Sequence, residues 1–156
     1  MNVKRVFVNG FIIFLGIGIY FLIMDFLGLS HHFYLRVLNL FIVIYGVNRT
    51  ISQNRDAGIR GYNTNLLAAF TTSMIGALLS VTALLTYIYV KGQNFVDGPE
   101  GYLKTLSEGF LFGGGELSIF QYCIGLLFES AATSIIVSFC LMQFWKSKVE
   151  NINKID

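Results

Sequence analysis

The sequence has few of the residues that a water-soluble domain needs. Charged residues make up only 13% of its 156 positions, and it contains one proline and two cysteines. So little charge argues against a fold whose surface faces water. The formal net charge of +2 is small, and the basic residues are scattered, which argues against nucleic-acid binding. Cys123 and Cys140 lie on one predicted helix, about 26 Å apart, which is too far for a disulfide between them.

The sequence is instead rich in long hydrophobic runs. Hydrophobic residues make up 54% of the chain, and the mean hydropathy is +0.64. Because lipid offers the peptide groups no hydrogen bonds, each run long enough to cross a hydrocarbon core of ~30 Å must form a helix. We expect an all-α integral membrane protein, a single domain over 1–156, with a four-transmembrane-helix bundle whose spans are approximately 6–29, 33–51, 66–90 and 117–145.

Three connections separate these predicted spans. The first is short and contains His31 and His32, and the second is a polar loop over 48–65. The third, over 91–116, contains Asp97 and Pro99, a combination typical of a helix start. Apolar residues then recur at helical spacing, so we predict a short interfacial helix in this outer loop between spans 3 and 4.

The distribution of basic residues predicts the orientation. Lysine and arginine are retained preferentially on the cytoplasmic side of a membrane. One predicted side has only two, apart from Arg36 at its membrane boundary, and these are Lys91 and Lys104. The other side has Lys4, Arg5, Arg49, Arg55, Arg60, Lys146, Lys148 and Lys154. Both termini are therefore predicted to be cytoplasmic.

Small and polar residues indicate which helix faces meet, because close approach and hydrogen bonds hold helices together in lipid. We expect the stripe on the third span to meet the stripe on the fourth. The first span offers Gly10, Gly18 and Asp25, and the second offers Arg36, Asn39, Val43, Gly46 and Thr50. The third offers Ala69, Ser73, Gly76, Ala77, Ser80 and Ala83, and the fourth offers Gly125, Glu129, Ala132 and Thr133.

Glu129 is the most informative polar residue, since an ionised carboxylate inside the fourth span costs at least a few kcal/mol. We predict an intramembrane polar site in which it is held by hydroxyls such as those of Ser80, Thr82 or Thr133. One interpretation is a carboxylate that accepts protons or binds a cation. The other is a neutral carboxylic acid that only fixes helix packing.

Two further groups of charged residues have structural and functional interpretations. Asp25 and Arg36 approach the outer boundary from either side of a short hairpin, which predicts a structural ion pair. The alternative is that Arg36 binds a lipid headgroup or an anionic substrate. Arg49, Arg55 and Arg60 form a cytoplasmic basic loop, which is either an ordinary topology signal or a contact for a partner or lipid phosphates.

Nothing in the sequence supports catalysis. No serine, cysteine or histidine belongs to a recognisable nucleophile constellation. The adjacent side chains of His31 and His32 point in different directions and have no second ligand set, so no metal site is predicted. We therefore expect no catalytic residues, no metal and no cofactor.

In outline the chain resembles a bacterial family of uncharacterised four-span inner-membrane proteins, with motif-like support from 55–70. The resemblance implies the bacterial inner membrane but no functional residues. We expect a non-enzymatic structural or accessory component of a membrane assembly, whose partners are the lipid bilayer and a second copy or another membrane-protein subunit. The alternative is a small transporter or channel subunit that uses Glu129 as a proton or cation site.

Overall fold

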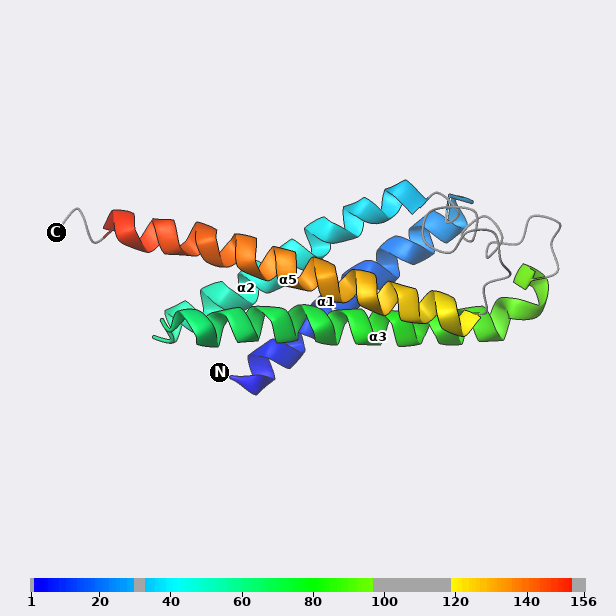
Figure 1. The fold of residues 1–156 in the computed structure, drawn as a ribbon. Coiled ribbons are helices and arrows are strands. Elements are labelled where there is room, and N and C mark those ends of the chain that lie inside the picture. The colour runs from blue at the N-terminus through cyan, green and yellow to red at the C-terminus, as the bar shows by residue number, and fades with distance from the viewer. Residues whose placement is uncertain (1, 30–32, 97–118, 153–156) are drawn as a thin grey trace.

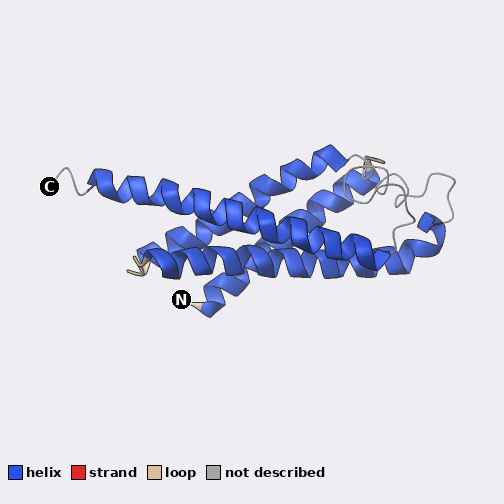
Figure 2. Cartoon of the chain, in the orientation of Figure 1, coloured by secondary structure: helices blue, strands red, loops and turns tan. Residues whose placement is uncertain are grey.

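The computed structural model describes residues 2–29, 33–96 and 119–152, and in these ranges the chain is helical, with no strand. The elements are α1 (Val3–Phe26), the 3-10 helix η1 (Phe33–Val37), α2 (Leu38–Asp56), α3 (Tyr62–Val96) and α5 (Ile119–Ile152). The helices lie alongside one another in an elongated bundle (Figures 1 and 2). The start of α1, the α2–α3 connection and the end of α5 lie toward the same end of the bundle.

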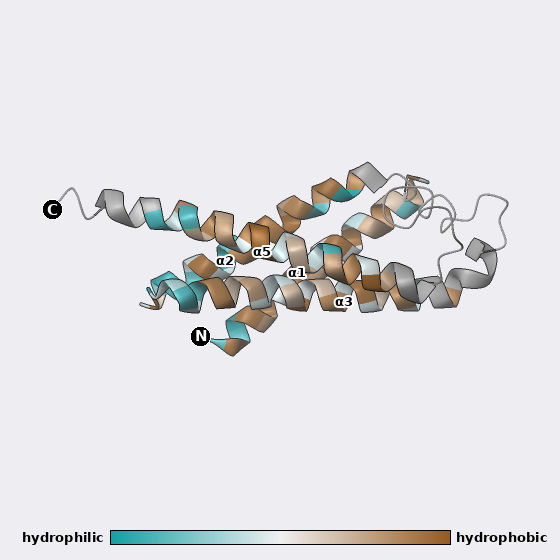
Figure 3. Cartoon of the chain, in the orientation of Figure 1, coloured by the Kyte–Doolittle hydropathy of each residue, from teal (hydrophilic) through white to brown (hydrophobic). Residues whose placement is uncertain are grey.

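Three of these helices are long and apolar enough to cross a membrane, namely Val3–Phe26, Tyr62–Tyr87 and Cys123–Lys146. They correspond to the first, third and fourth predicted spans, so the prediction of an all-helical membrane protein is confirmed at this level. The predicted second span coincides with η1 and the first part of α2, but this helix ends in polar residues and is less apolar. Hydrophilic residues gather at the end of the bundle that holds the α2–α3 connection (Figure 3).

The polar loop predicted over 48–65 is mostly helical, which is a correction. Helix α2 continues to Asp56 and α3 begins at Tyr62, so the connection is only 57–61. Gly58 stops α2 by adopting a φ of +79°, which favours glycine. Its N–H donates to the carbonyl of Arg55 at 2.8 Å, and the N–H of Ile59 donates to that of Asn54 at 2.9 Å.

The outer connections differ from prediction in a second way. Helix α3 continues to Val96, so the connection predicted to begin at residue 91 begins later. The predicted interfacial helix within 97–118 lies outside the described residues, as do His31 and His32.

Ile13 of α1 forms the centre of the core. It is fully buried and packs with Val47 and Ile51 of α2 in a cluster that includes Ala69, Val137 and Met142. The glycines that face it permit this close packing. A Cβ atom at Gly76 would lie 2.7 Å from Cγ2 of Ile13, and one at Gly46 would also overlap this side chain. Small residues therefore let α1, α2 and α3 approach closely, as expected for helices in lipid.

The small-residue stripe predicted on α3 is correct up to Ala77 and wrong at Ala83, which is exposed, and the stripe predicted on α5 is wrong. Ala69, Ser73, Gly76 and Ala77 are buried as expected. Helix α5 does pack on α3, but Glu129 and Ala132 are exposed. The buried positions of α5 are instead Cys123, Ser134, Val137, Ser138 and Met142. Gly18 of α1 was predicted to face inward, but a Cβ atom added there would have no atom within 4 Å.

Candidate functional site

A polar cluster joins α1, α2 and α3 within the membrane-spanning part of the bundle. Nδ2 of Asn9 donates to Oγ1 of Thr50 at 3.0 Å and to Oε1 of Gln53 at 2.9 Å. Oγ1 of Thr50 lies 3.1 Å from Oγ1 of Thr72. We call Asn9, Thr50, Gln53 and Thr72 the Asn9 network.

The Asn9 network holds helices together and offers little for chemistry. Asn9, Thr50 and Thr72 are each at most 1% exposed. The Thr72 hydroxyl also donates to the carbonyl of Ala68 at 2.7 Å, within its own helix. Thr50 was predicted to lie on an inward face, but this cluster was not predicted. The signal that could have found it is Asn9, an uncharged polar residue within an otherwise apolar span.

Asn54, which directly follows Gln53 of the Asn9 network on α2, has a different environment. It is fully buried, and neither its Oδ1 nor its Nδ2 has a hydrogen-bond partner in the described part of the chain. A polar group buried in this way usually costs stability. Asn65 lies nearby in the fold, because its Nδ2 donates to the carbonyl of Ile59, whose N–H binds the carbonyl of Asn54.

At the opposite end of the bundle, Asp25 has a partner that the sequence did not suggest. Its Oδ2 accepts a hydrogen bond of 2.6 Å from the Tyr87 hydroxyl of α3. The hydroxyl of Tyr20 donates to the carbonyl of Leu35 at 2.9 Å, which ties α1 to η1 beside Arg36. The ion pair between Asp25 and Arg36 stays a prediction.

The predicted basic loop does not exist as one loop. Arg49 and Arg55 belong to α2, and only Arg60 lies in the connection. The guanidinium of Arg55 lies over the ring of Trp145, 4.5 Å from its centroid, while the indole N–H donates to Oδ1 of Asn48 at 2.9 Å. Arg55 therefore helps to fix α5 against α2, which favours a structural role for this residue.

The residues of the predicted Glu129 site are not joined to one another by hydrogen bonds within the described residues. Glu129 and Thr82 are exposed, and the Thr82 hydroxyl donates to the carbonyl of Leu78 in its own helix at 2.8 Å. Oγ of Ser80 is buried without a partner in the described ranges, and Thr133 is half-buried. Glu129 thus lies on the outer surface of the single chain.

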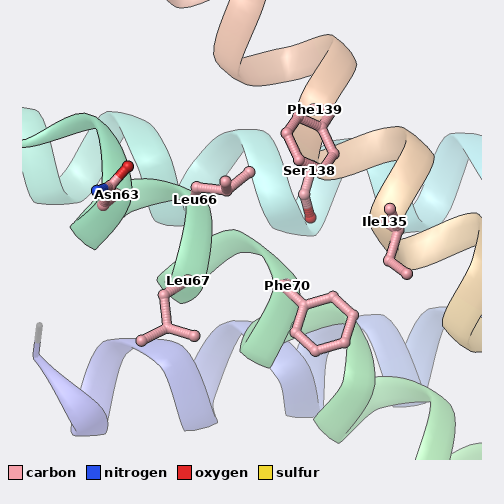
Figure 4. A pocket seen from close by; sticks show the side chains of 7 residues that line it. All are labelled: Asn63, Leu66, Leu67, Phe70, Ile135, Ser138 and Phe139. Carbon is pink, nitrogen blue, oxygen red and sulfur yellow. The ribbon is translucent and has the colours of Figure 1, made fainter.

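An open groove of about 470 Å³ runs between α3 and α5. Figure 4 shows Asn63 at one end, apolar side chains along both helices and the hydroxyl of Ser138 between them. Its lining residues are Asn63, Leu66, Leu67, Phe70, Ile135, Ser138 and Phe139. Since no titratable side chain lines it, the groove offers no acid–base chemistry.

Comparisons with protein-family models, curated proteins and solved structures find no match to this chain. The resemblance to a bacterial membrane-protein family therefore stays a prediction. A proposed function therefore rests on the geometry of the described residues.

Proposed function

We propose that this protein is a non-enzymatic subunit of a membrane assembly, in which Glu129 meets a transmembrane helix of a second copy. The observation that carries the proposal is a carboxyl group exposed on the outside of a helix within its membrane-spanning segment. Glu129 lies about 24 Å along α5 from Trp145, at ~1.5 Å per residue, and so within a hydrocarbon core of ~30 Å. An intramembrane acid normally faces protein or water.

The surface around Glu129 fits a protein partner. Phe128 and Ile136 are 74% and 62% exposed, and the small residue Ala132 is exposed between them. Ala132 allows a neighbouring backbone to come close, while the large side chains supply contact area on either side. In an isolated chain the same surface would leave the carboxyl group in lipid.

A second copy is the simplest occupant of this surface. Across a twofold axis each Glu129 side chain faces the other, so each carboxyl group has a polar partner in place of lipid. A protonated carboxyl group both donates and accepts, so two of them satisfy each other. Unlike a proton or cation carrier, this arrangement does not require a water-filled path through the protein to Glu129.

The proposal includes α2 as a fourth crossing. Together η1 and α2 are about 38 Å long, at ~2.0 and ~1.5 Å per residue respectively. The exposed side chains of α2 include Leu38, Phe41 and Tyr45, which recur on one helix face. Its polar residues Thr50 and Asn54 are buried. The apolar exposed face up to Tyr45 suits a helix segment whose surroundings are lipid, while the exposed Arg49 and Asp56 lie in the later part of α2.

We also propose that the protein lies in a bacterial inner membrane with both termini in the cytoplasm. The start of α1, the α2–α3 connection and the end of α5 share one end of the bundle (Figure 1). This end carries Arg5, Arg55 and Arg60, which supports its assignment to the cytoplasmic side.

Size measurements on purified protein in mild detergent and in lipid nanodiscs test the assembly. We expect wild-type protein and Glu129→Gln to be dimeric, because the amide can replace a neutral carboxyl group in hydrogen bonding. Glu129→Leu should weaken association about tenfold, the equivalent of one interhelical hydrogen bond. Thr82→Leu is the matched control, since it removes an exposed polar group that is already bonded to its own helix. A wild-type protein that is strictly monomeric in both media contradicts the proposal.

The alternative function, a proton or cation site at Glu129, is separated by the same variants. A carrier needs a group that ionises, so Glu129→Gln would abolish flux into proteoliposomes while leaving the dimer intact. If Glu129 is purely structural, wild-type protein and Glu129→Gln will give the same flux into proteoliposomes.

A further inference from the structure

A groove lies at the end of the bundle where α1 begins and α2 ends. It is an open groove of about 370 Å³ lined by Arg5, Gln53, Asp56 and Ala57. Arg5 directly precedes the long apolar run of α1, in which Phe7 and Val8 are exposed. The groove is therefore level with the boundary between hydrocarbon and headgroups.

Arg5 is held in position by the protein interior. Its Nη1 donates to the carbonyl of Gln53 at 2.8 Å, and Oε1 of Gln53 accepts from Nδ2 of the buried Asn9. Gln53 thus accepts from the guanidinium through its backbone carbonyl and belongs to the Asn9 network through its side chain. The bond to Gln53 is the only hydrogen bond of this side chain in the described part of the molecule. Its remaining N–H groups are available for a planar, two-oxygen acceptor such as a phosphate.

Asp56 supplies the opposite charge in the same groove. It is the last residue of α2 and is exposed, and the C-terminal end of a helix itself favours a positive group. Within the described residues, no ion pair joins Asp56 to Arg5. Two opposite charges that share a groove without contacting each other suit a ligand that carries both charges.

We propose that this groove binds the headgroup of a zwitterionic phospholipid with a primary amine, its phosphate on Arg5 and its ammonium on Asp56. The ammonium N–H groups can donate to the carboxylate, which the methylated nitrogen of choline cannot do. A glycerol headgroup offers the phosphate but no cation. The groove therefore prefers an ethanolamine headgroup over choline and glycerol headgroups. This inference does not depend on the proposed dimer.

Native mass spectrometry of the detergent-solubilised full chain tests the preference. The protein is titrated with phosphatidylethanolamine, phosphatidylcholine and phosphatidylglycerol that have identical acyl chains. We expect wild-type protein to bind phosphatidylethanolamine about fivefold more tightly than the other two, the value of one favourable exposed charge contact. Soluble phosphorylethanolamine, added without lipid, shows whether the headgroup alone suffices, and displacement of bound lipid by it supports the proposal.

Two substitutions assign the two charges. Asp56→Asn, at an exposed position, should remove the preference for ethanolamine while leaving phosphatidylglycerol binding unchanged or stronger. Arg5→Gln should weaken binding of all three lipids about equally. Arg49→Gln is the control, because it removes an equal charge from an exposed position of α2 outside the groove. Equal binding of the three lipids by wild-type protein overturns the proposal, as does an Arg49→Gln variant that behaves like Arg5→Gln. Thermal unfolding of each variant confirms that it is folded.

Discussion

Asn9 and Glu129 are two polar residues in membrane-spanning helices, but Asn9 is buried and Glu129 is exposed. Asn9 is 1% exposed and donates to side chains from α2, whereas Glu129 is exposed on the outer side of α5. Asn9 therefore serves the fold of one chain. Within the described residues, no hydrogen bond or ion pair joins Glu129 to that fold, and in the proposed assembly it contacts a second copy. The comparison separates a polar group that builds the bundle from a polar group that the bundle leaves exposed.

The largest effect on stability is expected from a substitution that forces the helices around Asn9 apart. A Cβ atom at Gly10 would lie 2.9 Å from the carbonyl oxygen of Thr72, a backbone atom that cannot move aside. We expect Gly10→Ala to lower the free energy of unfolding by about 2 kcal/mol. Unfolding in mixed micelles of SDS and mild detergent measures it. Gly18→Ala is the matched control on the same helix, because nothing lies within 4 Å of its added Cβ. Equal effects of both substitutions would show that the α1–α3 contact is looser than described.

Removing the Asn9 side chain should have a smaller effect. Asn9→Leu deletes two hydrogen bonds and leaves Oε1 of Gln53 without this donor, so we expect a loss of about 1 kcal/mol. A double-mutant cycle with Thr50→Val isolates the contact between the two side chains. A coupling energy of about 0.6 kcal/mol is expected, and a coupling of zero would contradict the Asn9 network.

Replacing Asn54 should raise the free energy of unfolding, whereas replacing Asn9 should lower it. Because neither polar atom of its side chain has a partner in the described residues, Asn54→Leu removes a buried polar group without breaking a bond. The free energy of unfolding should rise by up to about 1 kcal/mol. The same micelle assay measures it, and Asn9→Leu serves as the comparison. A clear loss of stability in Asn54→Leu would mean that the side chain has a partner, and the distinction between Asn9 and Asn54 would fail.

The smallest effect on the single chain is expected at Glu129 itself. Glu129→Leu should change the unfolding free energy of the dissociated monomer by less than about 0.5 kcal/mol, since an exposed side chain with no partner in the described chain loses nothing. The measurement requires dilute protein in excess detergent, so that association does not contribute. A large loss in the monomer would show that Glu129 contributes to the fold, as Asn9 does.

The helices themselves could be predicted from the sequence to a useful degree. Three apolar runs became Val3–Phe26, Tyr62–Tyr87 and Cys123–Lys146, within several residues of the expected bounds. The prediction of a loop over 48–65 was wrong because asparagine and aspartate, which favour turns, are helical there up to Asp56. Asn48 and Arg55 in fact find partners on Trp145 while remaining helical. The ends of a helix depend on such tertiary contacts as much as on composition.

The candidate site was less predictable than the fold. Glu129 could be singled out by its charge, but the expected hydroxyl partners Ser80, Thr82 and Thr133 are not hydrogen-bonded to it. Gly125, Glu129 and Ala132 looked like an inward stripe, yet Val137, Ser138 and Met142 occupy the buried face of α5. Small residues mark a surface suited to close approach without saying which neighbour approaches.

That this chain forms long apolar helices follows from its amino-acid sequence, because peptide groups placed in hydrocarbon must bond within their own segment. Which faces of those helices meet follows from their packing in three dimensions. In lipid an apolar side chain gains little by turning inward, so hydropathy cannot choose a face. Steric fit around Ile13 and the hydrogen bonds of Asn9 made that choice, and they left Glu129 on the outside.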